Sequence, residues 1–212
     1  MGTAAGNLNG SAANNALTGN AGTNTLQGYD GNDSLNGGAG ADKMVGGDGD
    51  DAYWVEDDED LIVEAENSGF DRLFSVISID LDNPSNAFVN LESVTLQGTG
   101  NLYAYGSSAN NVLIGNSGDN ILGGRAGSDS LAGGGGEDTF RFVKGYDQEV
   151  ITDFEDNIDT IRMFSFGVAN FTQAKTYATQ SGANVIFDFG AGDILTVRNT
   201  TINALADDVV FV

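Results

Sequence analysis

The stretch GYDGNDSLNGGAGADKMVGGDGDDAYW, residues 28–54, contains three nine-residue units in one register. Each unit has an aspartate at its sixth position and an apolar residue at its eighth: Asp33 and Leu35, Asp42 and Met44, Asp51 and Tyr53. The register extends back to residue 1 and forward through VEDDEDLIV, residues 55–63. Repeats of this kind are typical of solenoids, in which stacked repeats build one continuous core.

A second block with the same period covers residues 106–141. Its units are GSSANNVLI, GNSGDNILG, GRAGSDSLA and GGGGEDTFR. Their sixth and eighth positions are Asn111 and Leu113, Asn120 and Leu122, Asp129 and Leu131, Asp138 and Phe140. Of the 31 glycines in the chain, 25 lie in residues 1–54 and 98–136, so the turn-forming composition follows the repeats.

The repeat has a direct physical interpretation. Glycine at positions one, two and four allows a backbone with positive φ. The three residues around position eight form a short strand, and the side chain at position eight points inward. Two nonapeptides then make one coil, and coils stack about 4.8 Å apart. We therefore expect residues 18 apart to lie above one another: Asp33 with Asp51, Asp42 with Asp60, and Asp129 with Asp147.

Such stacked carboxylates repel one another unless a cation lies between them. Carboxylates and the backbone carbonyls of positions two and four offer a site made only of oxygen atoms, which suits Ca²⁺ better than Mg²⁺. The chain has no His and no Cys, which excludes disulfides and argues against zinc and copper. The formal net charge of −23 argues against nucleic acids and anionic membranes as partners.

The pattern GGxGxD followed by an apolar residue at position eight resembles the RTX (repeats-in-toxin, hemolysin-type) nonapeptide of bacterial proteins exported by type I secretion. The resemblance implies an all-β fold, a right-handed parallel β-roll with several Ca²⁺ ions between stacked turns. Carried over by position, the metal ligands would be Gly31, Asp33, Gly38, Gly40, Asp42, Gly47, Gly49, Asp51, Asp60, Gly127, Asp129, Gly134, Gly136, Asp138 and Asp147.

Some units depart from the family pattern. Tyr29 and Arg125 replace the second glycine of their units. The units around Gly6, Asn15 and Asn111 lack the aspartate, and there an asparagine ladder is an alternative to metal binding.

The composition predicts four parts. They are a first roll block at 1–63, a strand-rich spacer at 64–105, a second roll block at 106–148 and a β-rich cap at 149–212. Alternating apolar and polar residues predict strands at 70–81 and 88–98, with a turn at Pro84 between them. In the cap we expect a hairpin over 183–197 and one helical turn within 199–208.

The region after the second block leaves alternatives open. EVITDF and NIDTI resemble the run that closes many RTX rolls, and Asp147, Glu149, Asp153 and Asp159 form either a last Ca²⁺ site or a solvated strand edge. The acidic pair before the final apolar residues 209–212 resembles the tail of type I-secreted proteins and also fits a final edge strand.

These features predict a calcium-binding module that folds when Ca²⁺ binds, because binding energy then becomes folding energy. We expect no enzyme, with no catalytic and no cofactor-binding residues, since the chain has neither GxSxG nor a P-loop. No signal peptide and no apolar run long enough for a transmembrane helix is visible.

The resemblance implies a bacterial, extracellular location. Calcium ions and the type I secretion machinery are the expected partners, with no nucleic acid and no membrane insertion. The first nonapeptide begins in register at Met1, which suggests either an excised fragment, attached to or derived from a larger secreted protein, or a very short secreted protein. The alternative function is an ancillary polysaccharide-binding module of an extracellular carbohydrate-active enzyme such as an alginate epimerase. Its sugar contacts would lie on the outward strand face, although the acidic charge argues against a polyanion.

Overall fold

The computed structural model describes residues 5–83 and 88–212, and it consists mostly of short parallel strands. The turn expected at Pro84 lies outside the described residues. The chain forms two compact units, Met1–Gln97 and Gly98–Val212. Within the described residues, no helix is long and apolar enough to span a membrane.

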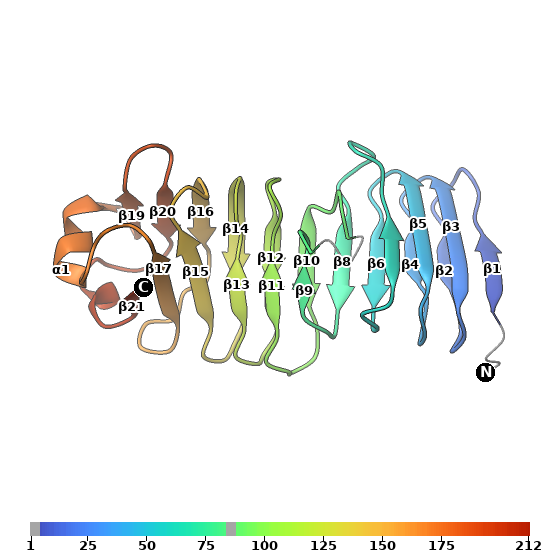
Figure 1. Cartoon of the computed structure of the whole chain (residues 1–212), viewed down its shortest axis with the longest axis horizontal. Coiled ribbons are helices and arrows are strands. Elements are labelled where there is room, and N and C mark those ends of the chain that lie inside the picture. The colour runs from blue at the N-terminus through green and yellow to red at the C-terminus, as the bar shows by residue number, and fades with distance from the viewer. Residues whose placement is uncertain (1–4, 84–87) are drawn as a thin grey trace. The chain divides into compact units, whose positions relative to one another are not determined.

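In the first unit the chain alternates between two parallel sheets (Figure 1). One sheet contains β1 (Gly6–Asn9), β3 (Asn24–Asp30), β5 (Lys43–Asp48) and β7 (Leu61–Val63). The other contains β2 (Ala16–Thr18), β4 (Ser34–Asn36), β6 (Ala52–Val55), β8 (Arg72–Ser75) and β10 (Ser93–Leu96). A two-residue strand, β9 (Ile79–Asp80), follows β8. Each nonapeptide thus supplies one strand, and the predicted parallel solenoid is confirmed.

The register of the first unit follows the 18-residue period. Leu26 pairs with Met44, and Met44 with Ile62. On the other sheet Leu35 pairs with Tyr53. All five side chains are fully buried, and burying an apolar side chain of this size contributes about 1.5–3 kcal/mol. The position-eight residues therefore form the core, as the repeat predicts.

The second unit has the same construction (Figure 1). One parallel sheet contains β11 (Tyr103–Tyr105), β13 (Ile121–Gly123), β15 (Thr139–Val143), β17 (Thr160–Phe164) and β21 (Val209–Phe211). The other contains β12 (Val112–Ile114), β14 (Ser128–Ala132), β16 (Gln148–Ile151) and β20 (Ile194–Val197). Strands β19 (Asn184–Asp188) and β18 (Ala178–Ser181) extend this second sheet in antiparallel pairing.

Nonrepeat segments close the second unit. The predicted hairpin is formed by β19 and β20. The helical turn expected within 199–208 is the 3₁₀ turn Ala204–Ala206, and a further short helix α1 (Phe171–Ala174) leads into a 3₁₀ turn at Lys175–Tyr177. Strand β21 pairs with β17, so the last apolar residues do form a strand of the sheet. The strands predicted at 70–81 and 88–98 are real but shorter than expected.

We expect removal of one position-eight side chain to destabilise the roll strongly. Leu113 is fully buried and pairs with Leu131, so Leu113→Ala should lower the free energy of unfolding by about 2–5 kcal/mol. The neighbouring Ile114 is 38% exposed, and Ile114→Thr should change the same quantity by less than about 1 kcal/mol. Urea unfolding in excess Ca²⁺ measures both. Equal losses in the two variants would contradict the inward assignment of position eight.

Candidate metal sites

The turns between strands carry the residues that the sequence analysis selected. All eight predicted glycine ligands, at positions two and four of their units, have a positive φ: Gly31, Gly38, Gly40, Gly47, Gly49, Gly127, Gly134 and Gly136. Tyr29 and Arg125 occupy position two with φ of 82° and 70°, so the turn keeps this conformation without glycine there.

Position one behaves differently from the prediction. The glycines at this position, such as Gly28 and Gly124, are not among the residues with positive φ. A Cβ atom built on Gly28 would instead contact Oδ2 of Asp33, and one on Gly124 would contact Oδ2 of Asp129. Glycine is needed here for space, because the position-six carboxylate of the same turn lies against its α-carbon.

The position-six carboxylates form ladders between successive coils. Asp33 Oδ1 accepts the backbone N–H of Asn15 at 2.6 Å, and Asp51 Oδ1 accepts that of Asp33 at 2.7 Å. Equivalent bonds join the other position-six residues: Asn24 to Asp42, Asp42 to Asp60, Asn111 to Asp129, and Asn120 to Asp138. The 18-residue stacking predicted for the first block is therefore confirmed.

In four of these aspartates the second carboxylate oxygen is buried and has no hydrogen-bond partner. The buried oxygens without a hydrogen bond in the described residues are Oδ2 of Asp33, Asp42, Asp51 and Asp129, and Oε2 of Glu149. A buried carboxylate oxygen without a partner costs several kcal/mol in a folded protein. A bound cation would satisfy these oxygens, so the residues present fit a hard metal ion such as Ca²⁺.

The electrostatics of the turns also favour a cation. Burial raises the pKa of Asp51, Asp60 and Asp138 to about 6 and that of Asp129 to about 7. Backbone N–H donors partly oppose this rise, and neighbouring carboxylates add to it. Burial also raises the pKa of Glu149 well above its ordinary value, with the Asp129 carboxylate as the second cause.

One predicted stacking is wrong. Asp129 aligns with Glu149, not with Asp147, in the pairing of β14 and β16. The connection between these strands is longer than the period, so Asp147 lies in an exposed turn with φ of 72°. Glu149 is buried, and its Oε1 accepts the N–H of Gly124 at 3.2 Å.

The residues proposed for a last site after the second block lie at two different turns. Asp153 accepts the N–H groups of Gly133 and Gly134 at 2.9 and 3.0 Å, and Asp159 accepts that of Asp138 at 3.0 Å. Glu149 instead approaches Gly124, at the other end of β14. These residues thus continue two separate ladders and do not converge on one site.

The sequence analysis missed the continuation of the first ladder beyond the nonapeptides. Asp71 Oδ1 accepts the N–H of Asp51 at 2.8 Å, and Glu92 Oε2 accepts that of Asp71 at 2.7 Å. Glu64 is buried beside this ladder and was not selected either. The apolar–polar alternation around residue 73 was the available signal, because it places an acidic residue two positions before an inward leucine, as in the repeats.

Comparisons with known proteins agree with the repeats. The family model for the RTX calcium-binding nonapeptide repeat (4 copies) matches residues 3–28, 18–53 and 105–140. No curated protein matches the chain. Among solved structures, the extracellular lipase LipA from Serratia marcescens is similar at 19% identity and a TM-score of 0.37. The similar region covers 100% of this chain and 40% of the lipase chain.

We expect the metal-free chain to be more stable at mildly acidic than at alkaline pH. The turn carboxyls with raised pKa bind more protons in the folded state than in the unfolded state. The stability that these carboxyls contribute should therefore be fully present below about pH 4. It should be lost progressively as pH rises through about 6 to 7. Far-UV circular dichroism of metal-stripped protein between about pH 5 and pH 8 measures the folded fraction that this linkage predicts to fall.

High salt provides the control for this titration. Salt screens repulsion between exposed charges but hardly affects buried groups, so the transition should persist at high ionic strength. A metal-free chain whose folded fraction rises with pH over this range would contradict the assignment of these carboxyls to buried turns.

Proposed function

The repeats of this chain are RTX calcium-binding nonapeptide repeats, and we propose that it is a noncatalytic module that folds when its turns bind several Ca²⁺ ions. One observation carries this proposal above all. Successive turns hold buried carboxylate oxygens that have no partner of their own. A polypeptide gains nothing from burying such groups unless a ligand meets them.

The ions would be held by carboxylates and backbone carbonyls together. The carboxylates are those of Asp33, Asp42, Asp51, Asp60, Asp129 and Asp138; the carbonyls are those of Gly31, Gly38, Gly40, Gly47, Gly49, Gly127, Gly134 and Gly136. When bound, Ca²⁺ supplies the positive charge that offsets repulsion within each ladder. The chain itself supplies the positive-φ turns and the bare α-carbons of position one.

Coupling between metal and fold follows from the same groups. Without metal, the ladder carboxylates must be protonated or repel one another, and the many glycines lose much conformational entropy on folding. With metal, the binding free energy adds directly to folding stability. We propose that this coupling serves a bacterial protein exported by type I secretion, which would stay unfolded at low Ca²⁺ inside and fold outside the cell. The chain would then be one part of a longer secreted protein.

The test is a Ca²⁺ titration of chelator-treated protein followed by far-UV circular dichroism, with Mg²⁺ in parallel. We expect a cooperative rise of β-structure with Ca²⁺ and little with Mg²⁺. Asp42→Asn keeps an oxygen for the N–H of Asn24 but removes the charge, so it should shift the midpoint to several-fold higher Ca²⁺. A β spectrum that is complete in chelator at neutral pH would overturn the proposal.

Asp58 provides the matched control for this variant. It is exposed and lies outside the ladders, so Asp58→Asn makes the same change in net charge. Its midpoint should stay close to that of the unaltered chain. Equal shifts in the two variants would mean that net charge, not the turn site, governs the response.

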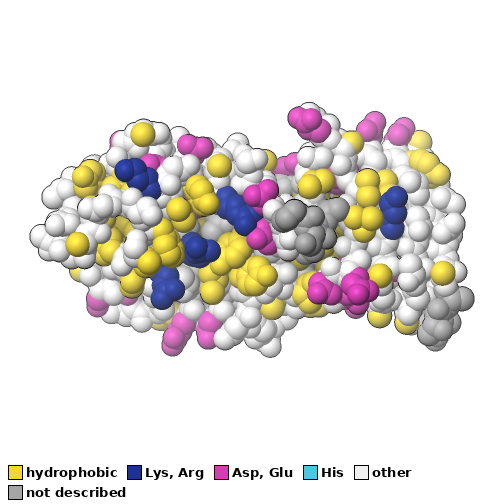
Figure 2. All heavy atoms as spheres, viewed as in Figure 1, with side chains coloured by type: hydrophobic (Ala, Val, Ile, Leu, Met, Phe, Trp, Pro, Cys, Tyr) yellow, Lys and Arg dark blue, Asp and Glu magenta, His cyan; other side chains and the backbone are white. Residues whose placement is uncertain are grey.

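A second candidate function is binding of an acidic polysaccharide, and it is supported by one surface of the second unit. Figure 2 shows basic side chains among apolar ones over β13, β15 and β17. The guanidinium of Arg141 lies 5.1 Å from the ring centre of Tyr105 and 4.9 Å from that of Phe164. Tyr105 also stacks on Tyr103, and Arg125 lies over its ring at 5.8 Å. Aromatic rings with guanidinium groups suit stacking on sugars and pairing with uronate carboxylates.

Affinity electrophoresis in gels containing alginate tests this second function. We expect the Ca²⁺-loaded chain to be retarded, and Arg141→Gln to abolish most of the retardation. Arg198→Gln is the control, because Arg198 is exposed and follows β20 in the other sheet of the same unit. Absence of retardation in the unaltered chain, or equal losses in both variants, would dismiss this function.

A further inference from the structure

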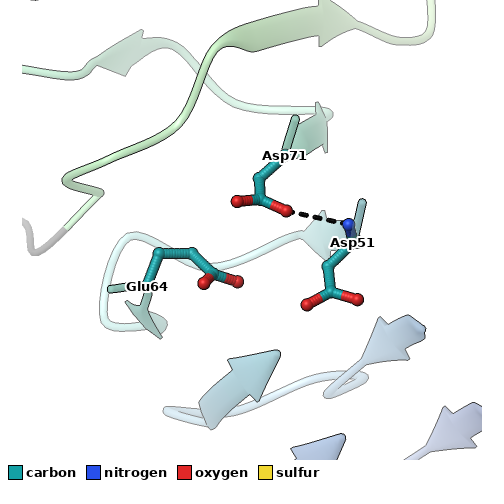
Figure 3. Close-up of side chains that lie close together, drawn as sticks. All are labelled: Asp51, Glu64 and Asp71. Atoms are coloured by element: carbon teal, nitrogen blue, oxygen red, sulfur yellow. Dashed lines mark hydrogen bonds between the residues drawn. The ribbon is translucent and has the colours of Figure 1, made fainter. Parts of the chain in front are cut away.

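The first block of repeats ends at a cluster of three buried carboxylates. Asp51, Glu64 and Asp71 are 0%, 6% and 1% exposed, and one oxygen of each lies within 4.8 Å of the others (Figure 3). Ca²⁺ lies about 2.3–2.6 Å from its oxygen ligands, so oxygens of one ion are at most about 5 Å apart. The three side chains therefore meet the spacing of ligands to a single ion.

An unpartnered atom points into this cluster. Oδ1 of Asp51 accepts the N–H of Asp33, but its Oδ2 is buried without a hydrogen bond. A Cβ atom built on Gly46 would contact Asp51 Oδ2 and Glu64 Oε1 together. Both oxygens thus converge on the space beside the bare α-carbon of Gly46. Gly46 has no positive φ, so its missing side chain is explained by this space and not by its backbone.

Glu64 comes from outside the nonapeptide pattern. It lies after β7, beyond residues 3–53 that the repeat model matches in this block. Figure 3 shows its side chain extending toward Asp51 and Asp71. Its Oε2 accepts the hydroxyl of Ser68 at 3.0 Å, and its Oε1 accepts the hydroxyl of Tyr53. These two bonds fix the carboxylate at the cluster.

Burial and the neighbouring carboxylates disfavour the charged form of the cluster when no cation is bound. Burial is the main cause of the raised pKa of Glu64, to about 8, and the carboxylates of Asp71 and Asp51 are further causes. Burial likewise raises the pKa of Asp71 to about 6, with Glu92 and Asp50 adding to it. A cation inside the cluster would remove this mutual repulsion.

We propose that Asp51, Glu64 and Asp71 bind one Ca²⁺ ion at the end of the first block, in a site that requires Glu64 and Asp71 from beyond the repeats. This inference rests on the proposed calcium function and extends it. The repeat turns would use aspartates of two nonapeptides, whereas this site would join the nonapeptide at 46–54 to residues beyond the first block. The ion would thereby fasten residues 64–71 onto the turn of Asp51.

Counting bound ions tests the site directly. Ca²⁺ competition with a chromophoric chelator should give one ion fewer for Glu64→Gln than for the unaltered chain. Gln keeps the size of Glu64 and one accepting oxygen but removes its charge. Glu66→Gln is the matched control, since Glu66 is exposed two residues away, and it should bind the full number. An unchanged count for Glu64→Gln would mean that Glu64 is only a buried hydrogen-bonding group, and would overturn the inference.

Asp71→Asn gives an independent variant if Glu64→Gln does not fold. It keeps an acceptor for the N–H of Asp51 and should also lose one ion. The double variant should lose the same single ion, because both residues serve one site; loss of two ions would overturn the shared site. Asp42→Asn separates this inference from the general function: reduced calcium binding in that variant with a full count in Glu64→Gln would leave the function standing and remove this site.

Discussion

At the turns of Asp33, Asp42, Asp51 and Asp129, a single carboxylate joins one coil to the next and keeps one buried oxygen without a hydrogen bond. Its Oδ1 accepts a backbone N–H from the preceding coil, as between Asp51 and Asp33. Its Oδ2 lies buried against the position-one glycine without a partner. The first bond sets the register of the stack, and under the proposed function the second oxygen would make the same stack dependent on a cation. One aspartate side chain therefore both joins neighbouring coils and offers an unpartnered oxygen to a cation.

This dual role explains why the glycines of the repeat are not equivalent. Those at positions two and four provide a backbone conformation, which Tyr29 and Arg125 also adopt. The glycine at position one provides space for the carboxylate, as Gly28 does for Asp33. A side chain in place of Gly28 would displace the Asp33 carboxylate from its hydrogen bond to the preceding coil and from the proposed metal site.

Much of the fold and part of the site could be predicted from the sequence. The nine-residue period fixes inward residues such as Leu35 and Met44 and places Asp33 under Asp51. The period fails where a connection gains residues. Asp51 is followed in its ladder by Asp71 and Asp129 by Glu149, a spacing of 20 in both cases. A strict period places the next ligand too early, because the extra residues lengthen an exposed turn while inward side chains keep their pairing.

The position-six residues change along each block from neutral asparagines to acidic residues. The first coils carry Asn24 and Asn120, whose amide oxygens accept N–H groups of their own turns, from Asn20 and Asn116. Aspartates follow, and at the far end of each block a glutamate joins the ladder or lies beside it, Glu149 or Glu64. The blocks therefore begin with coils whose position-six residue is neutral and end with turns that concentrate negative charge, where the repeats give way to nonrepeat chain.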